Sequence, residues 1–446
     1  MADEIKAALE NGPATPAGRQ AIWWLTRVHR QGEGASLTDL ERYAPALASR
    51  FAPVASDAEM AEEWRARAAR LGAILGLSFE SKSEIELTAK LEAAKDRRWE
   101  IDFAVEEAPP HQLTKVEWRR IHDFRLEVRE AGPGDAAILA DLESRCPIVV
   151  GDTSIWFDRG ERYFDFSRLM EDCTVGLASV DGSPAAVTCG ARHAVRIGGA
   201  LKSIITVSHL RVLPEHQRKG LWGAANRVLD KYWPQVDGSN AYIAVDNAGM
   251  QHGFRHTPNK WPTPIWWARL DCAQLAGPPA GRNATPADGP MIVELINAFH
   301  GGEEMFVPYD EASLAARLAR AGELYGWDRV RLADGAVVGV WPAGRALRLV
   351  TERGGVQTVS EPGVVLDYGF APGAEGVFEA LLRGWCGWLA ERGMDRLSIF
   401  TSPAARGAEL IRSLTEDVEA FNMWTPGVAT TPDAGSKGLY VDPIYF

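Results

Sequence analysis

The chain has 446 residues and a hydrophobic content of 46%, which is enough for about three domains with buried cores. Its net charge of −12 argues against a protein that binds nucleic acid or an anionic membrane surface, so we expect neither partner. Five cysteines without a Cys-x-x-Cys spacing, no signal peptide and no run of about 18 apolar residues predict a cytoplasmic protein without a metal site.

Residues 1–120 are predicted to form an α-helical N-terminal domain. Hydrophobic residues recur at helical spacing over 60–77 and over 84–98, whereas strand signals are few. The run 108–111 contains two prolines and is predicted to be a linker that ends this domain.

A second unit is predicted over residues 125–272, and it begins with a strand followed by a helix. The Asp181-Gly182 dipeptide lies between two apolar runs and predicts a β-hairpin. The apolar run 241–245 predicts a buried strand, and 265–270 predicts the strand that closes this unit.

Residues 204–233 are the most informative part of the chain. β-Branched residues predict a strand that extends to Val212, and a basic loop after Pro214 leads to Gly220. Apolar residues then recur at helical spacing up to Trp233. Because the first backbone N–H groups of a helix lack intrahelical partners and lie at the positive end of its dipole, this loop is predicted to bind an anion, most naturally phosphate.

This segment resembles the cofactor motif of the GNAT superfamily of coenzyme-A-dependent N-acyltransferases. The family motif is Arg/Gln-x-x-Gly-x-Gly/Ala after the fourth strand, often preceded by Val-x-Pro. Here Val212-Leu213-Pro214 precedes a loop in which Gln217 and Gly220 match the motif. Trp222 stands where the family usually has a small residue, and Gly223 follows one position late. The order of strands and helices over the whole second unit is similar to that of a GNAT domain.

A third unit, residues 283–446, follows an Ala/Gly/Pro-rich linker and repeats the second in a degenerate form. A hairpin at Asp334-Gly335 and a strand over 364–368 are predicted, followed by a loop, a helix over 377–392 and another strand. The loop has lost its basic residues and carries Glu375, which would repel phosphate. The predicted fold class is therefore α/β, with two GNAT-like mixed-sheet lobes after the α-helical N-terminal domain.

The resemblance implies acetyl-CoA or a longer acyl-CoA as co-substrate and no metal. The backbone of the strand before Pro214 would hold pantetheine, and the N–H groups of the loop would hold the pyrophosphate. The residues that the resemblance assigns to the cofactor are Leu210, Arg211, Val212, Gln217, Arg218, Lys219, Gly220, Leu221, Trp222, Gly223 and Asn247.

The resemblance also indicates candidates for proton transfer. His209 occupies the position where the family often has a glutamate base, and an imidazole is a reasonable base. A hydrogen-bonded structural histidine in the sheet is an equally good interpretation. Phe254 replaces the family's tyrosine acid, so His252 or His256 is a substitute donor, with Tyr242 weaker. A thiolate leaving group, whose thiol has a pKa near 8.5, can also depart without a donor.

The C-terminal residues 440–446 are predicted to form a last strand that ends in an aromatic residue. Some two-lobed GNAT relatives use the C-terminal carboxylate as base, which makes Phe446 a further candidate. Asp367 and Asp442 are alternatives as residues that line the acceptor pocket.

The predicted activity is transfer of an acetyl or longer acyl group to a primary amine of a small molecule or an amino acid. The alternative is a catalytically inactive GNAT-fold protein with a binding or regulatory role, which the departures at Trp222 and Phe254 favour. A carrier protein or peptide is a third class of partner, and a homo-oligomer is compatible with the sequence.

Overall fold

The computed structural model divides into two compact units, with the division after Arg125. It describes residues 13–15, 17–19, 21–22, 25, 74–84, 86–93, 97–105, 107, 113–121, 124–150, 152–217, 219–245, 247, 250, 262–425 and 437–445.

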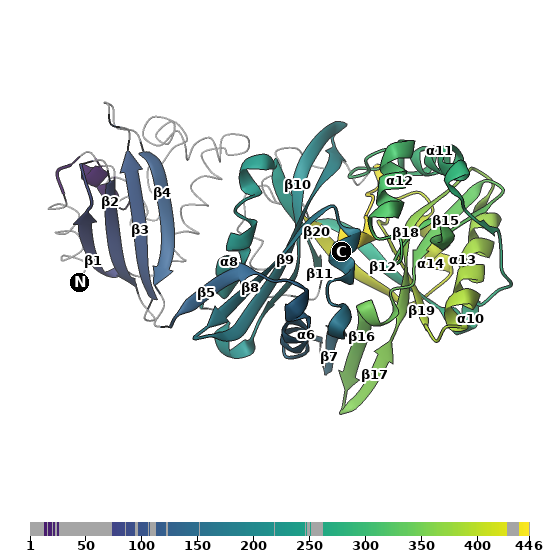
Figure 1. Ribbon diagram of the computed structural model, residues 1–446, viewed down its shortest axis with the longest axis horizontal. Helices are drawn as coiled ribbons and strands as arrows, with labels where there is room; N and C mark the ends of the chain where they lie inside the picture. The colour runs from purple at the N-terminus through teal and green to yellow at the C-terminus, as the bar shows by residue number, and fades with distance from the viewer. Residues whose placement is uncertain are drawn as a thin grey trace. The chain divides into compact units, whose positions relative to one another are not determined.

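The first unit contains a four-stranded antiparallel sheet in which each strand pairs with the next (Figure 1). The helix predicted over 84–98 is therefore wrong for the described residues. Leu87, Thr88, Ala89 and Leu91 are buried, whereas Glu86 and Lys90 are exposed. The apolar residues Leu87, Ala89 and Leu91 follow the two-residue period of a strand. Residues 60–73 of the other predicted helix lie outside the described residues. The strands are β1 (Ile74–Ser81), β2 (Glu86–Ala93), β3 (Arg97–Val105) and β4 (Leu113–Ile121).

The second unit is built on one twelve-stranded sheet with the order β13-β14-β15-β18-β19-β12-β20-β11-β10-β9-β8-β5 (Figure 1). We call β5, β8–β11 and β20 the first lobe, and the remaining strands the second lobe. The strands are β5 (Leu126–Glu130), β8 (Asp172–Val180), β9 (Ser183–Ile197), β10 (Ala200–Val212), β11 (Gly238–Ala244), β12 (Thr263–Asp271), β13 (Arg282–Asn283), β14 (Val330–Ala333), β15 (Ala336–Trp341), β18 (Pro362–Phe370), β19 (Arg396–Thr401) and β20 (Val418–Trp424).

The two lobes exchange a strand. The prediction that 265–270 closes the first lobe is wrong, because β12 pairs with β19 and β20 and has no pairing with β11 among the described residues. Strand β20, from the C-terminal part of the chain, takes the place beside β11. The exchange joins the lobes into one continuous sheet, and a local sequence pattern carries no information about such distant pairing.

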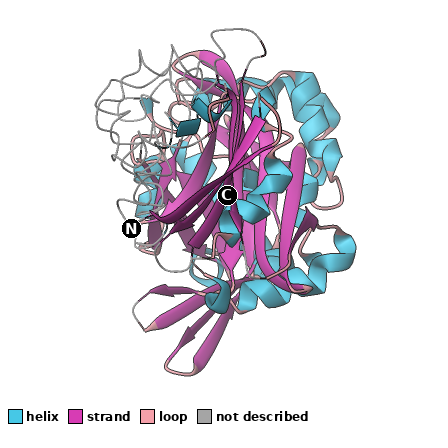
Figure 2. Cartoon of the chain, turned by 90° about the vertical axis from the view of Figure 1, so that its left-hand side faces the viewer, coloured by secondary structure: helices cyan, strands magenta, loops and turns pink. Residues whose placement is uncertain are grey.

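Helices and a small accessory sheet flank the large sheet (Figure 2). The accessory sheet has the order β17-β16-β7-β6, so it joins segments from both lobes. Its strands are β6 (Ile148–Val150), β7 (Thr153–Asp158), β16 (Arg348–Arg353) and β17 (Val356–Ser360). The α-helices of this unit are α6 (Ala136–Ser144), α7 (Asp165–Leu169), α8 (Leu221–Ala225), α10 (Cys272–Leu275), α11 (Gly289–His300), α12 (Glu311–Arg320), α13 (Glu375–Ala390) and α14 (Ala408–Ser413).

Both hairpins predicted from Asp-Gly dipeptides are confirmed. Strands β8 and β9 are joined through Asp181 and Gly182, whose φ angles of 50° and 82° are those of a type I′ turn. Strands β14 and β15 are joined through Asp334 and Gly335. The strand predicted over 364–368, the helix predicted over 377–392 and the strand predicted after it are also present, as β18, α13 and β19.

The helix predicted up to Trp233 is only partly present. Helix α8 ends at Ala225, and a 3₁₀ turn over Asn226–Leu229 replaces its continuation. The Asn226 carboxamide oxygen accepts a hydrogen bond from the Thr188 hydroxyl at 2.7 Å, which ties the turn to β9. Leu229 packs where a Cβ on Gly190 would lie, so the close approach requires glycine in the strand.

The C-terminal segment is not the predicted strand. Among the described residues, Leu439 makes a single bridge to Glu304, and Pro443–Tyr445 form a 3₁₀ turn. Ile444 and Tyr445 are buried, so apolar packing holds this end of the chain.

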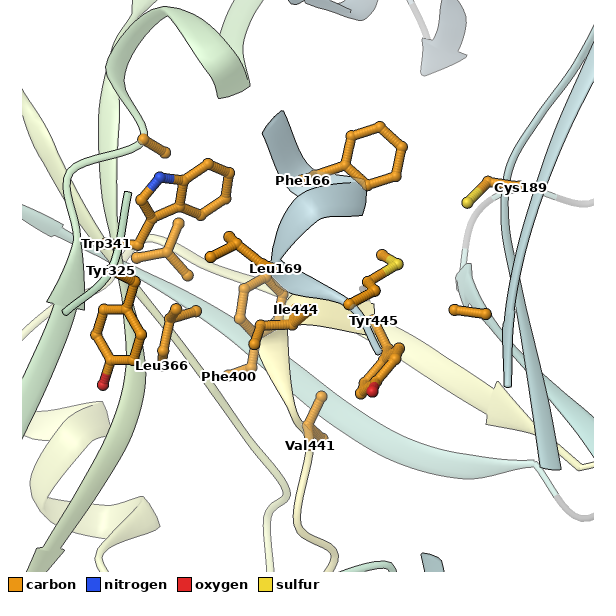
Figure 3. Packing of buried hydrophobic residues seen from close by; sticks show 14 of the residues in the cluster. Phe166, Leu169, Cys189, Tyr325, Trp341, Leu366, Phe400, Val441, Ile444 and Tyr445 are labelled. Atoms are coloured by element: carbon orange, nitrogen blue, oxygen red, sulfur yellow. The ribbon is translucent and has the colours of Figure 1, made fainter. Parts of the chain in front are cut away.

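The hydrophobic core of the second unit continues through both lobes. Figure 3 shows Phe166 and Leu169 of α7 together with Trp341, Leu366 and Phe400 of the second lobe. The C-terminal turn contributes to the same cluster. The two lobes therefore pack around shared apolar side chains as one unit.

Candidate active site

Strands β10 and β11 separate after a short parallel pairing. They pair only over Ile204–Thr206 and Gly238–Asn240, although β10 runs on to Val212 and β11 to Ala244. The backbone groups of β10 that face β11 beyond this point are free of strand partners in the described sheet. They can hydrogen-bond an extended ligand between the two strands.

A β-bulge lies in β10 just where the strands separate. Ser208 pairs with Cys189 and Arg211 pairs with Val187, so two residues of β10 face one of β9. His209 lies in the bulge with a φ of 51°, a left-handed conformation that is unfavourable for a residue with a side chain. Strain of this kind is often found at functional sites, because the surrounding structure must hold it in place.

A cavity of about 180 Å³ opens at the separation. Its walls come from β10, β11, the segment from α6 to α7, and the second lobe. Most of the lining side chains are apolar or aromatic. The aromatic ones are Phe157, Phe166, Trp222, Tyr242, Trp267, Trp341, Phe400 and Phe421.

The His209 imidazole faces this cavity and contacts aromatic rings. Its ring lies 4.1 Å from that of Phe166, measured between centroids, and 6.3 Å from that of Tyr163. Burial, with the guanidinium groups of Arg159 and Arg211 as further causes, lowers the pKa of His209 well below its usual range. The imidazole is therefore neutral at pH 7 and able to accept a proton, although it is a weakened base.

The residues predicted to bind the cofactor lie in two groups. Leu210, Arg211, Trp222 and Asn247 line the cavity. The loop residues Gln217 and Lys219 and the first residues of α8 follow the end of β10, and Gly220 has the left-handed φ of 83° at the start of that helix. Arg218, His252, His256 and Phe446 lie outside the described residues.

Trp222 forms part of the cavity wall. Its side chain packs with Ala241, Ile243 and Trp424 of the first lobe. The bulky residue at the motif position thus contributes apolar surface to the cavity, and its backbone N–H still belongs to the first turn of α8.

A second, more polar cavity of about 240 Å³ shares Tyr242 with the first. Asp442 and Arg317 line it, as do His193 and Tyr445, whose rings are stacked at 3.8 Å. Burial raises the pKa of Tyr242, so its hydroxyl stays protonated between the two cavities.

Asp367 does not line either cavity. It is 2% exposed, bonds to Arg317 at 3.0 Å, and accepts hydrogen bonds from the hydroxyls of Tyr309 and Tyr325 at 2.9 and 2.8 Å. Of the two carboxylates proposed for an acceptor pocket, only Asp442 faces a cavity.

Sequence reasoning missed two ionised residues at the site. Glu143 of α6 and Arg159, which follows β7, form an ion pair in the cavity wall and are 1% and 3% exposed. Neither belongs to a motif, and the strand and helix that carry them meet only through tertiary packing. Both lie among other charged residues in the sequence, so no local signal distinguishes them.

Among the described residues, no group of three or more His, Cys, Asp or Glu side chains has the geometry of a metal site. The helices in that part of the chain include none that is both long and apolar enough to cross a bilayer.

No known family model matches the sequence, and no curated protein matches it. Solved structures do match. Saccharomyces cerevisiae N-myristoyltransferase with bound myristoyl-CoA aligns with a TM-score of 0.50 and 10% identity, over 76% of this chain and 87% of that one. A GCN5-related N-acetyltransferase from Sphaerobacter thermophilus aligns with a TM-score of 0.42 and 15% identity, over 70% of this chain and all of the other. At these identities the likeness concerns the fold alone: the fold of this chain is similar to that of N-myristoyltransferase.

Proposed function

We propose that the second unit transfers an acyl group from acyl-CoA to a primary amine. The observation that carries this proposal is the separation of β10 and β11 at a bulge, directly over an apolar cavity. An extended pantetheine arm fits beside the free edge of β10, because an edge strand offers alternating N–H and C=O groups.

The reaction needs one bond to form and one to break. The neutral amine nitrogen attacks the thioester carbonyl carbon, the C–N bond forms, and the C–S bond breaks as the thiolate departs. The proton lost by the amine passes to a base, and the thiolate takes up a proton as free coenzyme A. His209 faces the cavity in its neutral form and is the proposed base, acting directly or through water.

The thiolate is a good leaving group, since a thiol has a pKa of about 8.5. Tyr242 is the residue proposed to stabilise that thiolate, because its hydroxyl is protonated and its side chain lines the cavity. Since burial raises its pKa, it donates a hydrogen bond and the thiolate takes its proton from water. Its ring belongs to β11, on the other side of the separation from His209. The base and the hydrogen-bond donor would then approach the thioester from opposite strands.

The aromatic lining supports an apolar group inside the cavity. A dry cavity of about 150 Å³ is known to bind benzene, so the present one has room for a comparable apolar group. An acyl chain longer than acetyl and an apolar acceptor side chain are both compatible with this lining.

Calorimetric titration with acetyl-CoA and with a long-chain acyl-CoA tests the binding step. We expect binding that is lost in Gly220→Asp, which places a carboxylate and a strained backbone in the proposed phosphate loop. Gly373→Asp is the matched control, because Gly373 has a φ of 85° in the corresponding loop of the second lobe. Loss of binding in both variants, or in neither, would contradict the assigned loop.

Release of free thiol from the bound acyl-CoA in the presence of amines tests the chemical step. Amine-dependent release is expected. Tight binding without release for any amine would instead favour a GNAT-fold binding protein.

A further inference from the structure

One end of the cavity holds a cluster of buried polar atoms without hydrogen-bond partners. Five side chains contribute one such atom each, and four of these side chains line the cavity. The atoms are Glu143 Oε1, Arg159 Nε, Tyr163 Oη, His209 Nδ1 and Arg211 Nε.

These five side chains lie together. Arg159 is ion-paired with Glu143, and its guanidinium carbon lies 5.6 Å from the centre of the Tyr163 ring. The Tyr163 ring lies 6.3 Å from the imidazole of His209. Arg211 is the first paired residue after the bulge that contains His209, and its charge contributes to the lowered pKa of that imidazole. The cluster therefore forms a polar end to a cavity whose other walls are mainly apolar.

Such a cluster is unusual in a folded protein. Buried polar groups nearly always have partners, because an unpaired one loses its hydrogen bond to water and gains nothing in return. Several unpaired atoms around one cavity indicate a ligand that supplies the missing partners.

The chemistry of the atoms defines that ligand. The Nε–H groups of Arg159 and Arg211 can only donate, so they require an acceptor, and a carboxylate is the acceptor that guanidinium groups bind best. Glu143 Oε1 can only accept while it is ionised, so it requires a donor such as an amine. His209 Nδ1 can take either role, according to its tautomer.

We propose that this polar end binds the α-amino-carboxylate group of an amino-acid acceptor. The carboxylate lies against Arg159 and Arg211, and the amino group lies between Glu143 and His209. The assignment rests on the proposed acyl transfer and names its acceptor class. The apolar part of the cavity then receives the acceptor's side chain.

The charges of the site agree with this ligand. Two guanidinium groups and one carboxylate leave one surplus positive charge, since His209 is neutral. An amino acid whose amine has lost its proton carries one negative charge. This anion neutralises the surplus positive charge of the site, so the site binds the anion in preference to the zwitterion. The anion is also the form whose amine can attack a thioester.

Calorimetry on the full chain, with coenzyme A present, tests the assignment with matched probes. L-Phenylalanine is compared with phenethylamine, which lacks the carboxylate, and L-leucine with isoamylamine. We expect each amino acid to bind at least about tenfold more tightly than its amine. Equal binding within both pairs, or no binding of either amino acid, would overturn the assignment.

The variant Arg211→Gln tests whether the guanidinium of Arg211 binds the carboxylate of the amino acid. It should reduce the preference for the amino acid to less than about threefold, whereas Arg353→Gln, which removes an exposed guanidinium from β16, should leave it unchanged. Arg211 is used first because Arg159 is paired with a buried carboxylate, and removing Arg159 alone would leave that charge buried and destabilise the fold. The double variant Glu143→Gln/Arg159→Gln removes both charges and should also abolish the preference. A preference that survives in both variants would refute the assignment.

Acyl-CoA binding and thiol release with the matched amines are measured in the same preparations. Turnover of amines without any preference for amino acids would refute the acceptor assignment and leave the acyl transfer intact. Failure of acyl-CoA to bind would refute the proposed function itself, whatever the amino acids do.

Discussion

The β10–α8–β11 segment of the first lobe and the β18–α13–β19 segment of the second lobe have the same backbone topology. In each, two parallel strands are joined through a helix and pair over only three positions, up to Thr206 in β10 and Val364 in β18. Each first strand then carries a register shift against its antiparallel neighbour. His209 and Asp367 occupy equivalent places, three residues beyond the last parallel pair.

The two β–α–β segments differ in what lies between their parallel strands where these separate. Residues 207–212 of β10 are half-buried and residues 207–211 line a cavity, whereas every residue of β18 is buried. Asp367 is held by Arg317, which also binds Asp442 at 2.8 Å. The same backbone topology thus gives an open site in one lobe and a closed ionic network in the other. The side chains at equivalent positions decide which of the two results.

The largest expected effect on stability comes from removing the cation of the ionic network in the second lobe. Arg317→Met leaves Asp367 and Asp442 without their cation and should lower the free energy of unfolding by about 3–5 kcal/mol. Urea denaturation measures this loss. Arg192→Gln in the first lobe breaks a more exposed pair with Asp172 and should cost less than about 1 kcal/mol. Equal losses in the two variants would mean that the network does not specifically stabilise the second lobe.

Packing of each helix on its sheet should give the next largest effect. A Cβ on Gly190 would lie 2.4 Å from Leu229, and one on Gly363 would lie 2.7 Å from Leu389. Alanine at either glycine should therefore destabilise the protein by about 1–3 kcal/mol, measured by urea denaturation. Gly376→Ala is the control, since nothing lies within 4 Å of its added Cβ. A difference between the lobes here would show that their helices are not equally tightly packed.

Loss of the proposed base should affect turnover and leave the fold largely intact. His209→Ala is expected to lower kcat by at least about tenfold, a cautious floor for a general base. Because the pKa of His209 is lowered, the wild-type kcat should stay constant from pH 7 down through the usual titration range of histidine and fall only below it. The comparison uses kcat at saturating amine, so that protonation of the free amine does not enter. A rate that is unchanged in the variant would remove His209 from the mechanism.

The last expected effect is a pH dependence of stability in the first lobe. His193 Nε2 bonds to the Thr206 hydroxyl at 2.7 Å, at the last parallel pair, and burial lowers the pKa of His193 to about 4. The unfolded chain then binds a proton more readily than the folded one between that value and about 6.5. Stability should fall as the pH is lowered through this window, and the fall should be smaller in His193→Gln. Identical pH profiles in thermal melts would contradict the role of His193.

Local patterns in the sequence predicted most of the elements in the second unit. The Asp-Gly turns, the strands around them and the helix α13 follow from residue spacing and turn chemistry. In the first unit, the helical spacing over 84–98 gave a wrong prediction, because Leu87, Ala89 and Leu91 also fit the two-residue period of a strand.

The candidate site was predictable only in part. The motif led to the end of β10 and to His209 because a strand, a loop and a helix are consecutive in the chain. Glu143 and Arg159 come from other elements and could not be found in this way.

By itself, the sequence determined the order of strands, turns and helices in the two lobes, since these depend on neighbouring residues. Only the tertiary structure decided that β12 and β20 change places, that one strand separation opens into a cavity and that the other is closed by Arg317. Those outcomes depend on contacts between residues far apart in the chain, and their energies depend on burial, which no local pattern records.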